Sequence, residues 1–250
     1  MGRKVKQTAP GKMVTVKGNK MHVYAQGKGD NTFVFMSGSG TRYPMDDFKP
    51  LWSLLVKDNQ IAVVDKAGYG WSEVTVAPRD IDTILEETRE ALKLSGIKPP
   101  YILVPHSLSG LEALYWGQKY PGEVKAIMGL DPAIPDYYEQ AKLPSMGLIK
   151  CIAWLTGYKI ITPDMVNEAR YVMENARKIK TNPRPVDIPT CFFISNGKGV
   201  AVKNWEEMLV SYLEDFKNKK HISLGCGHYV HKYESEKIAA DIIKFCAEIH

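Results

Sequence analysis

The sequence predicts an α/β protein with a mainly parallel, doubly wound sheet of about eight strands. Short apolar runs, typical of strands buried on both faces of a parallel sheet, alternate along the chain with segments of helical spacing. The connections are short, and this order implies parallel strands joined by helices. With 250 residues, 44% apolar and 24% charged, the chain fits one globular domain, 1–250.

The elements follow in order from local pattern. Residues 11–27 predict a hairpin, because the β-rich segments 13–16 and 21–25 flank the turn residues Lys17-Gly-Asn-Lys20. Apolar runs predict further strands at 32–36, 61–64, 101–104, 124–130, 190–194 and 221–224. Apolar residues three and four apart predict helices at 47–56, 81–95, 111–120, 202–216 and 234–247.

The alternation breaks after the sixth strand, between 132 and 187. Three helical patterns, 137–140, 146–155 and 163–178, replace it, and Asn182-Pro-Arg-Pro185 closes the segment as a stiff loop. We interpret 132–187 as a helical cap inserted over the strand ends. Its aromatic and aliphatic residues either line an apolar substrate pocket or form the core of the cap. They are Tyr137, Tyr138, Met146, Leu148, Ile149, Trp154 and Leu155.

Composition argues against several partners. The net charge is +5 without a long basic run, so we expect no nucleic-acid partner. No stretch of about 18 apolar residues is present, so no membrane span is expected, and no signal peptide begins the chain. A leader or anchor removed from the N-terminus would leave no trace. The four cysteines form no close metal-ligand pair, so we expect free thiols and no metal site. Free thiols favour a cytoplasmic location. We also expect no cofactor.

The segment Tyr101-Ile-Leu-Val-Pro-His-Ser107-Leu-Ser-Gly110 is the centre of the functional interpretation. An apolar strand is followed at once by small residues and then by a helical pattern, which puts Ser107 at a strand-to-helix turn. Such a turn exposes the serine hydroxyl and turns the next backbone N–H toward a developing oxyanion. Pro105 and Ser109 stand where the usual Gly-x-Ser-x-Gly pattern has glycines. The alternative is a serine that only caps a helix.

Three other loops also follow predicted strands: Ser37-Gly-Ser-Gly40, Asp65-Lys-Ala-Gly-Tyr-Gly-Trp-Ser72 and Gly227-His228. The carboxyl ends of parallel strands lie at one edge of a sheet, so these loops should converge. With the Ser107 turn they make the chain, from about Lys12 onward, resemble the α/β-hydrolases.

The resemblance implies roles for individual residues. Ser107 would be the nucleophile, His228 the base, and the N–H groups of Ser39 and Leu108 the oxyanion donors. His231 is a nearby rival for the base. The side chain of His106 should point into the fold, and Cys226 is an alternative nucleophile that lacks a strand-to-helix turn of its own.

The carboxylate that orients the histidine is less obvious. The family commonly places it after the strand at 190–194, but the loop 195–204 contains no Asp or Glu. Asp131 ends the sixth strand, where haloalkane dehalogenases and some lipases of this fold place the acid. We therefore predict Asp131 as the orienting acid, with an Asp-Pro turn as the alternative and with Asp187 and Glu206 as the acids to compare.

A serine nucleophile implies acyl transfer through an acyl-enzyme. The cap holds no acidic cluster for a free amine, so the expected substrate is a small-molecule ester with an apolar acyl or alkyl group. A thioesterase, a lysophospholipase-like enzyme, a cofactor-free haloperoxidase-like enzyme and a ligand-binding protein without turnover are the alternatives. The sequence leaves the natural substrate and the oligomeric state open.

Overall fold

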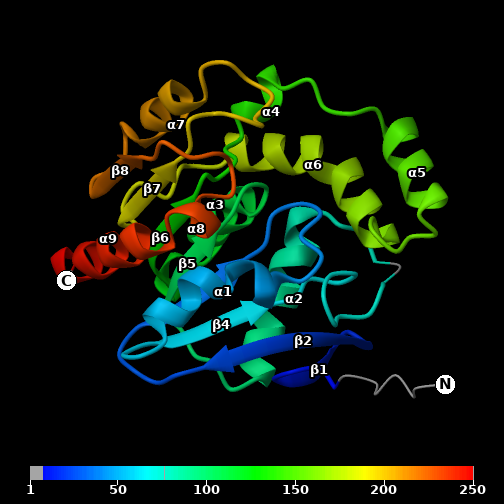
Figure 1. Cartoon of the computed structure of the whole chain (residues 1–250), viewed down its shortest axis with the longest axis horizontal. Coiled ribbons are helices and arrows are strands. Elements are labelled where there is room, and N and C mark those ends of the chain that lie inside the picture. The colour runs from blue at the N-terminus through cyan, green and yellow to red at the C-terminus, as the bar shows by residue number, and fades with distance from the viewer. Residues whose placement is uncertain (1–7, 76, 250) are drawn as a thin grey trace.

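A mostly parallel sheet runs through the molecule (Figure 1). The structure is a computed structural model that describes residues 8–75 and 77–249. Within these residues eight strands pair in the order β1-β2-β4-β3-β5-β6-β7-β8. They are β1 (Lys12–Val16), β2 (Asn19–Gln26), β3 (Thr32–Met36), β4 (Gln60–Val64), β5 (Tyr101–Pro105), β6 (Val124–Leu130), β7 (Thr190–Ile194) and β8 (Lys219–Ser223). β2 pairs antiparallel with β1 and β4, and the other neighbours are parallel, so the predicted sheet is confirmed.

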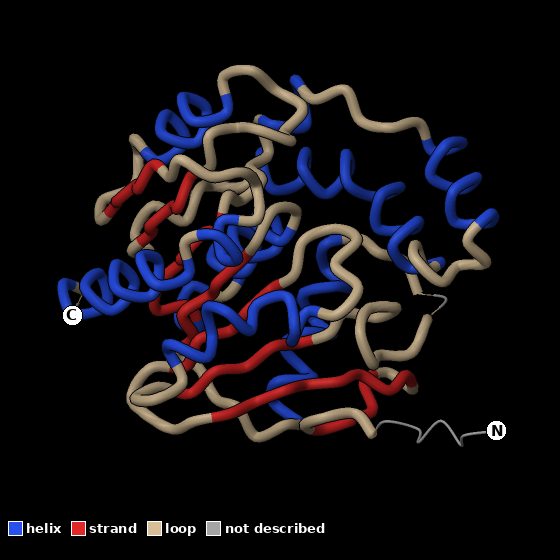
Figure 2. Tube along the Cα trace, viewed as in Figure 1, coloured by secondary structure: helices blue, strands red, loops and turns tan. Residues whose placement is uncertain are grey.

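Helices cover both faces of this sheet (Figure 2). They are α1 (Pro44–Leu55), α2 (Ile81–Leu94), α3 (Ser109–Lys119), α4 (Tyr137–Gln140), α5 (Met146–Leu155), α6 (Pro163–Thr181), α7 (Trp205–Leu213), α8 (Val230–Tyr233) and α9 (Ser235–Glu248). Alternate residues of a strand point to opposite faces and so enter different cores. In β5, Ile102 and Val104 pack in the core beneath α1 and α9, whereas Leu103 packs in the core beneath α2, α3 and α7.

Helices α4, α5 and α6 lie between β6 and β7 in the chain and gather in one part of the molecule (Figure 1). A buried ionic cluster links α6 to α3 and to the loop after β4. The ammonium of Lys66, in the loop after β4, donates to Glu112 of α3 at 2.7 Å and to Glu168 of α6 at 2.5 Å. Attraction to these two carboxylates outweighs the opposing effect of burial and raises the pKa of Lys66. If α6 moved away, Glu168 would leave the cluster and the remaining buried charges would lose a partner. The cluster therefore stabilises α6 in this position.

Several element boundaries differ from the predicted ones. α1 begins at Pro44 rather than at residue 47, because a proline suits the first turn of a helix, where its missing N–H is not needed. α7 is shorter than 202–216, and α8 was not predicted. The four-residue α8 is too short to show helical periodicity, and it interrupts the connection between β8 and α9.

Candidate active site

Ser107 lies at the turn between β5 and α3 with a φ of +54°, in the left-handed region that non-glycine residues rarely adopt. Two backbone contacts hold it there. The Ser107 N–H donates to the Leu130 carbonyl at 3.4 Å, and the Ala133 N–H donates to the Ser107 carbonyl at 2.8 Å. The turn is therefore fastened on both sides to the chain that leaves β6, which is how a strained conformation is maintained.

Close packing around this turn explains which small residues it needs. A Cβ at Gly38 would lie 2.8 Å from the Cβ of Ser107, and one at Gly110 would lie 2.3 Å from the Ala133 carbonyl oxygen. Ser109 stands where the usual pattern has a glycine, and its side chain is fully buried and hydrogen-bonded. Its hydroxyl donates to the Met36 carbonyl at 2.6 Å and accepts from the His106 N–H at 3.0 Å. The hydroxyl thus ties the turn to the end of β3.

Asp131 and His228 meet although 97 residues separate them. The Nδ1–H of His228 donates to Oδ2 of Asp131 at 2.6 Å. Asp131 directly follows β6 and has a φ of +49°, and its side chain is fully buried. The His228 side chain is 23% exposed and reaches a cavity. The carboxylate holds the ring at Nδ1, and Nε2 makes no hydrogen bond within the described residues.

The second oxygen of Asp131 is also fully engaged. Its Oδ1 accepts from the Ser195 N–H at 2.8 Å and from the indole Nε1–H of Trp205 at 2.7 Å. The loop 195–204, which contains no acid, therefore contributes a backbone donor to an acid from the neighbouring strand. Sequence reasoning missed Trp205, because nothing local to α7 indicates which carboxylate its indole contacts.

One cavity of about 280 Å³ joins these groups. Ser107 and His228 both line it, and so do Ser39 and Leu108. The walls are apolar, and no Asp, Glu, Lys or Arg is among the lining residues. The other lining residues are Ala133, Tyr137, Tyr138, Leu143, Pro144, Met146, Ile149, Ala169, Val172, Gly199, Val200 and Trp205.

The predicted pocket residues divide into two groups. Tyr137, Tyr138, Met146 and Ile149 line the cavity. The prediction for Trp154 is wrong: its side chain is 71% exposed and lies outside the cavity. Leu148 and Leu155 are exposed as well. The reason is geometric, because these three residues lie away from the side of α5 that carries Met146 and Ile149.

The proposed oxyanion donors are positioned without a competing partner. Among the hydrogen bonds of the described residues, none uses the backbone N–H of Ser39 or of Leu108. Leu108 precedes the first residue of α3, and N–H groups at a helix start have no partner within the helix. Both residues line the same cavity as Ser107.

The rival residues have other contacts. His106 is buried, its Nε2–H donates to the His228 carbonyl at 3.1 Å, and burial holds its pKa well below the ordinary value. The Nε2 of His231 is 2.8 Å from Oδ2 of Asp47. Burial raises the pKa of the Cys226 thiol, and Cys226 does not line the cavity, which argues against a cysteine nucleophile.

Comparisons with known proteins were consistent with this architecture. No protein-family model matches the chain. The chain is 53% identical over 152 residues to the uncharacterized protein YbdG of Bacillus subtilis. The matched segment covers 61% of this chain and 46% of that relative. It therefore spans about half the length of this relative.

Solved structures extend the comparison over nearly the whole chain. A haloalkane dehalogenase loop variant from Bradyrhizobium elkanii superposes with a TM-score of 0.75 at 15% identity, covering 95% of this chain and 96% of that one. The enol-lactonase from Burkholderia xenovorans gives a TM-score of 0.72 at 13% identity, with 94% and 100% covered. The chain has the α/β-hydrolase fold, as the sequence predicted.

Within 8–75 and 77–249, no group of three or more His, Cys, Asp and Glu side chains is arranged to hold a metal ion. In the same ranges no helix combines the length and the hydropathy needed to cross a bilayer.

Proposed function

We propose that this protein is a serine hydrolase that cleaves a carboxylic ester through an acyl-enzyme, with Ser107, His228 and Asp131 as its catalytic triad. The observation that carries the proposal is the 2.6 Å contact between Asp131 and His228, with Ser107 lining the cavity that the ring faces. A serine hydroxyl alone is a weak nucleophile, and a base held next to it is what activates it.

The chemistry follows from the free ring nitrogen. Nε2 of His228 accepts the proton of the Ser107 hydroxyl as its oxygen attacks the ester carbonyl. Asp131 accepts the hydrogen bond from Nδ1–H, which keeps the ring in the required tautomer and stabilises the imidazolium. The N–H groups of Ser39 and Leu108 stabilise the tetrahedral oxyanion. His228 then returns the proton to the leaving alcohol, and water releases the acyl group by the same steps.

The cavity supports an apolar ester as the substrate class. Its walls are aromatic and aliphatic, and no acidic or basic side chain other than His228 lines it. A charged acyl group would lose its hydration there without gaining a partner, which is costly. An apolar acyl or alkyl group gains by leaving water, at roughly 0.8 kcal/mol for each buried CH₂.

Turnover of a series of p-nitrophenyl esters of increasing chain length tests the proposal. The Ser107→Ala variant should lower kcat by about 10⁴-fold or more, because the covalent step is lost. A fluorophosphonate probe should label the wild type and fail to label the variant. Equal turnover of the two proteins would refute the assignment. Absence of both turnover and labelling in the folded wild type would favour a ligand-binding protein on this fold.

A further inference from the structure

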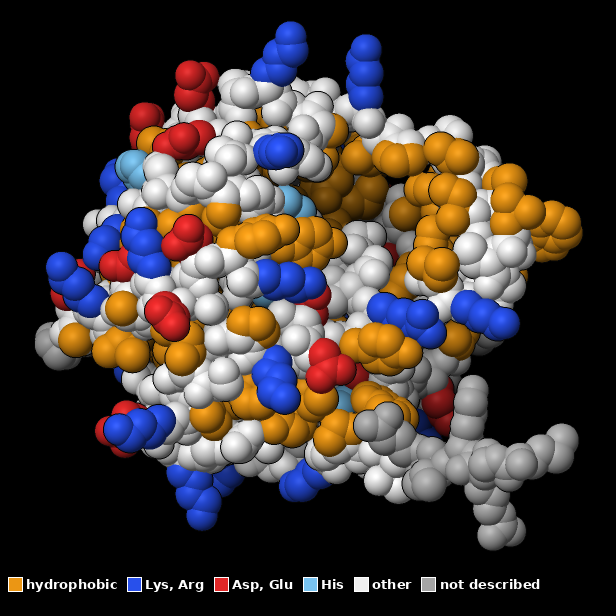
Figure 3. Space-filling view, viewed as in Figure 1, with side chains coloured by type: hydrophobic (Ala, Val, Ile, Leu, Met, Phe, Trp, Pro, Cys, Tyr) orange, Lys and Arg blue, Asp and Glu red, His pale blue; other side chains and the backbone are white. Residues whose placement is uncertain are grey.

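The outer side of α5 and the turn after it expose several apolar side chains. Six residues carry them, and we call these residues the outer apolar patch: Leu148, Ile152, Trp154, Leu155, Tyr158 and Ile160. Trp154 and Leu155 are 71% and 68% exposed. Figure 3 shows hydrophobic side chains gathered over this end of the molecule. Exposed apolar side chains that gather in one place mark interaction sites, whereas singly scattered ones are ordinary.

The inner side of the same helix faces the cavity and the rest of the protein. Met146, Ile149 and Ala153 recur at spacings of three and four, so they share one side of α5. Met146 and Ile149 line the cavity, and Ala153 is the one buried residue of α5. A helix that is apolar all round is normally buried all round. In α5 only the inner side is covered, so the outer apolar patch lacks a partner within the described residues.

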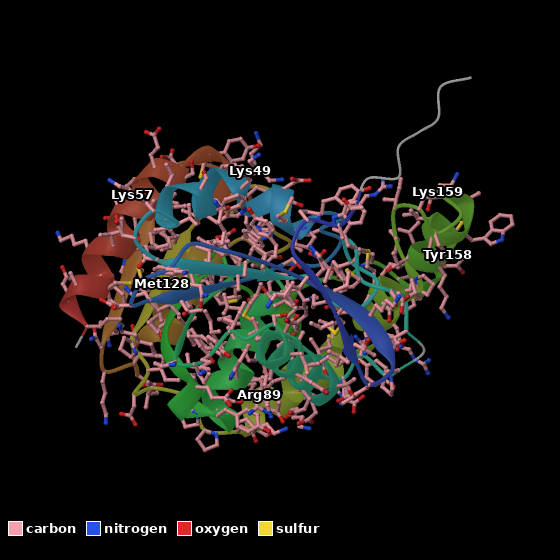
Figure 4. The ribbon with its side chains drawn as sticks, turned by 90° about the horizontal axis from the view of Figure 1, so that it is seen from below. Lys49, Lys57, Arg89, Met128, Tyr158 and Lys159 are labelled. Carbon is pink, nitrogen blue, oxygen red and sulfur yellow. The ribbon has the colours of Figure 1, made fainter. Side chains whose placement is uncertain are left out.

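The segment that carries the patch has charged side chains of a single sign. Residues 141–162 contain Lys142, Lys150 and Lys159 and no Asp or Glu. All three lysines are exposed. Figure 4 shows Tyr158 and Lys159 together at the outer end of this region, away from the strand residue Met128. Apolar residues, a tryptophan, a tyrosine and lysines are the set that favours the interface between water and a lipid bilayer.

We propose that the outer apolar patch docks on the surface of a bilayer that contains anionic lipids. Leu148, Ile152 and Leu155 would enter the boundary between headgroups and acyl chains, with Trp154 and Tyr158 at headgroup level. The lysines would pair with anionic headgroups. A second copy of the chain fits less well, because a symmetric contact brings the same lysines of both copies to one interface without an acidic partner.

This docking goes beyond the proposed hydrolase activity and does not depend on it. The cavity and the outer apolar patch lie close together, because α5 carries cavity-lining residues on one side and patch residues on the other. A docked protein would hold the cavity close to a source of apolar molecules.

Vesicle flotation tests the proposal with vesicles of phosphatidylcholine alone or with 30% phosphatidylglycerol. The wild type should float with the anionic vesicles and at least tenfold less with the neutral ones. Trp154→Ser/Leu155→Ser should lose most of this binding, and Lys150→Glu/Lys159→Glu should lose the preference for anionic vesicles. Ile243→Ser, which changes an exposed apolar residue of α9, is the matched control and should bind as the wild type does.

Two further measurements separate the alternatives. Tryptophan fluorescence should shift to shorter wavelength on anionic vesicles, and Trp154→Phe should remove the shift while binding persists. Ser107→Ala should bind like the wild type, so a failure of the hydrolase assignment leaves this test intact. Wild-type protein that ignores anionic vesicles, or patch variants that bind unchanged, would overturn the proposal. A wild-type dimer that the Trp154→Ser/Leu155→Ser variant converts to a monomer would overturn it in favour of contact between copies.

Discussion

Within residues 8–75 and 77–249 two histidines turn Nδ1 toward an aspartate, and only one of them has a free second nitrogen, whereas His231 contacts Asp47 through Nε2. His228 faces Asp131 with 2.6 Å between Nδ1 and Oδ2, and His22 faces Asp65 with 2.8 Å between the same two atoms. The difference lies at the far nitrogen of each ring. Nε2 of His22 is hydrogen-bonded to the Pro10 carbonyl, and the His22 ring is fully buried. Nε2 of His228 makes no hydrogen bond within the described residues, and the His228 ring reaches a cavity.

A carboxylate at Nδ1 therefore does not by itself leave the other ring nitrogen free. A second polar partner turns His22 into a structural cross-link between the N-terminal hairpin and the loop after β4. Ser72 lies beside it, but its hydroxyl donates to the Asp65 carbonyl and accepts from the His22 N–H, so it is not available for attack. Ser107 instead lines the cavity that His228 reaches.

The largest expected effect comes from removing each carboxylate's charge. Asp131→Asn should lower kcat by about 10³- to 10⁴-fold at little cost in stability, because an amide stabilises the wrong tautomer of His228 and no imidazolium. Asp65→Asn should lower the free energy of unfolding by about 1–3 kcal/mol and change kcat by less than about tenfold, because its pair is structural. Ester turnover and urea unfolding of both variants make the measurement.

If Asp131→Asn keeps full activity, the acid is another residue, and Asp187→Asn and Glu206→Gln become the variants to measure. Should Asp65→Asn fail to fold, Ser72→Ala serves in its place, because it removes only one hydroxyl from the same loop.

A smaller effect is expected at Trp205, which donates to Asp131 at 2.7 Å. Trp205→Phe keeps the apolar wall of the cavity but removes the donor. A hydrogen bond to a charged group contributes about 1.5–3 kcal/mol, so kcat should fall about 10- to 100-fold. Trp52→Phe is the matched control, since its indole donates to the Met45 carbonyl at 2.8 Å on another part of the fold. Equal kcat values for the two variants would mean that Trp205 does not position the acid.

The smallest effect concerns the change in the free energy of unfolding with pH. Burial lowers the pKa of His231 and of His106, and it outweighs the contact of His231 with Asp47. The unfolded chain therefore binds more protons below pH 6.5, and the free energy of unfolding should fall there by at most about 1.4 kcal/mol per pH unit for each histidine. His231→Asn should reduce this loss in urea unfolding between pH 6.5 and 5.5. An unchanged pH dependence would contradict the assignment of His231 as a buried neutral ring.

His22 should respond in the opposite direction. Burial lowers its pKa, but the hydrogen bonds to Asp65 and to the Pro10 carbonyl together raise it above the ordinary value. The folded state then binds the extra proton above pH 6.5, so stability from this pair is present below pH 6.5 and is lost as the pH rises through the raised pKa. His22→Gln should flatten the alkaline side of the curve and leave the acid side unchanged.

Most of the fold could be predicted from the sequence, because its signals are local. Apolar runs such as 32–36 and 190–194 correspond to β3 and β7, and the small residues around Ser107 correspond to the turn between β5 and α3. The absence of an acid from 195–204 was also visible along the chain, and it directed attention to Asp131. The error at Trp154 had a local cause as well, since hydropathy alone does not tell which side of α5 is covered.

The sequence by itself determined the order of strands and helices and the places where reactive side chains follow a strand, because period and turn chemistry are written in neighbouring residues. Only the tertiary structure decided which histidine keeps a free Nε2, that the indole of Trp205 reaches Asp131, and that the outer side of α5 is left uncovered. These features depend on contacts between segments far apart in the chain, such as the 97 residues between Asp131 and His228. Such contacts are fixed by packing, which no local pattern records.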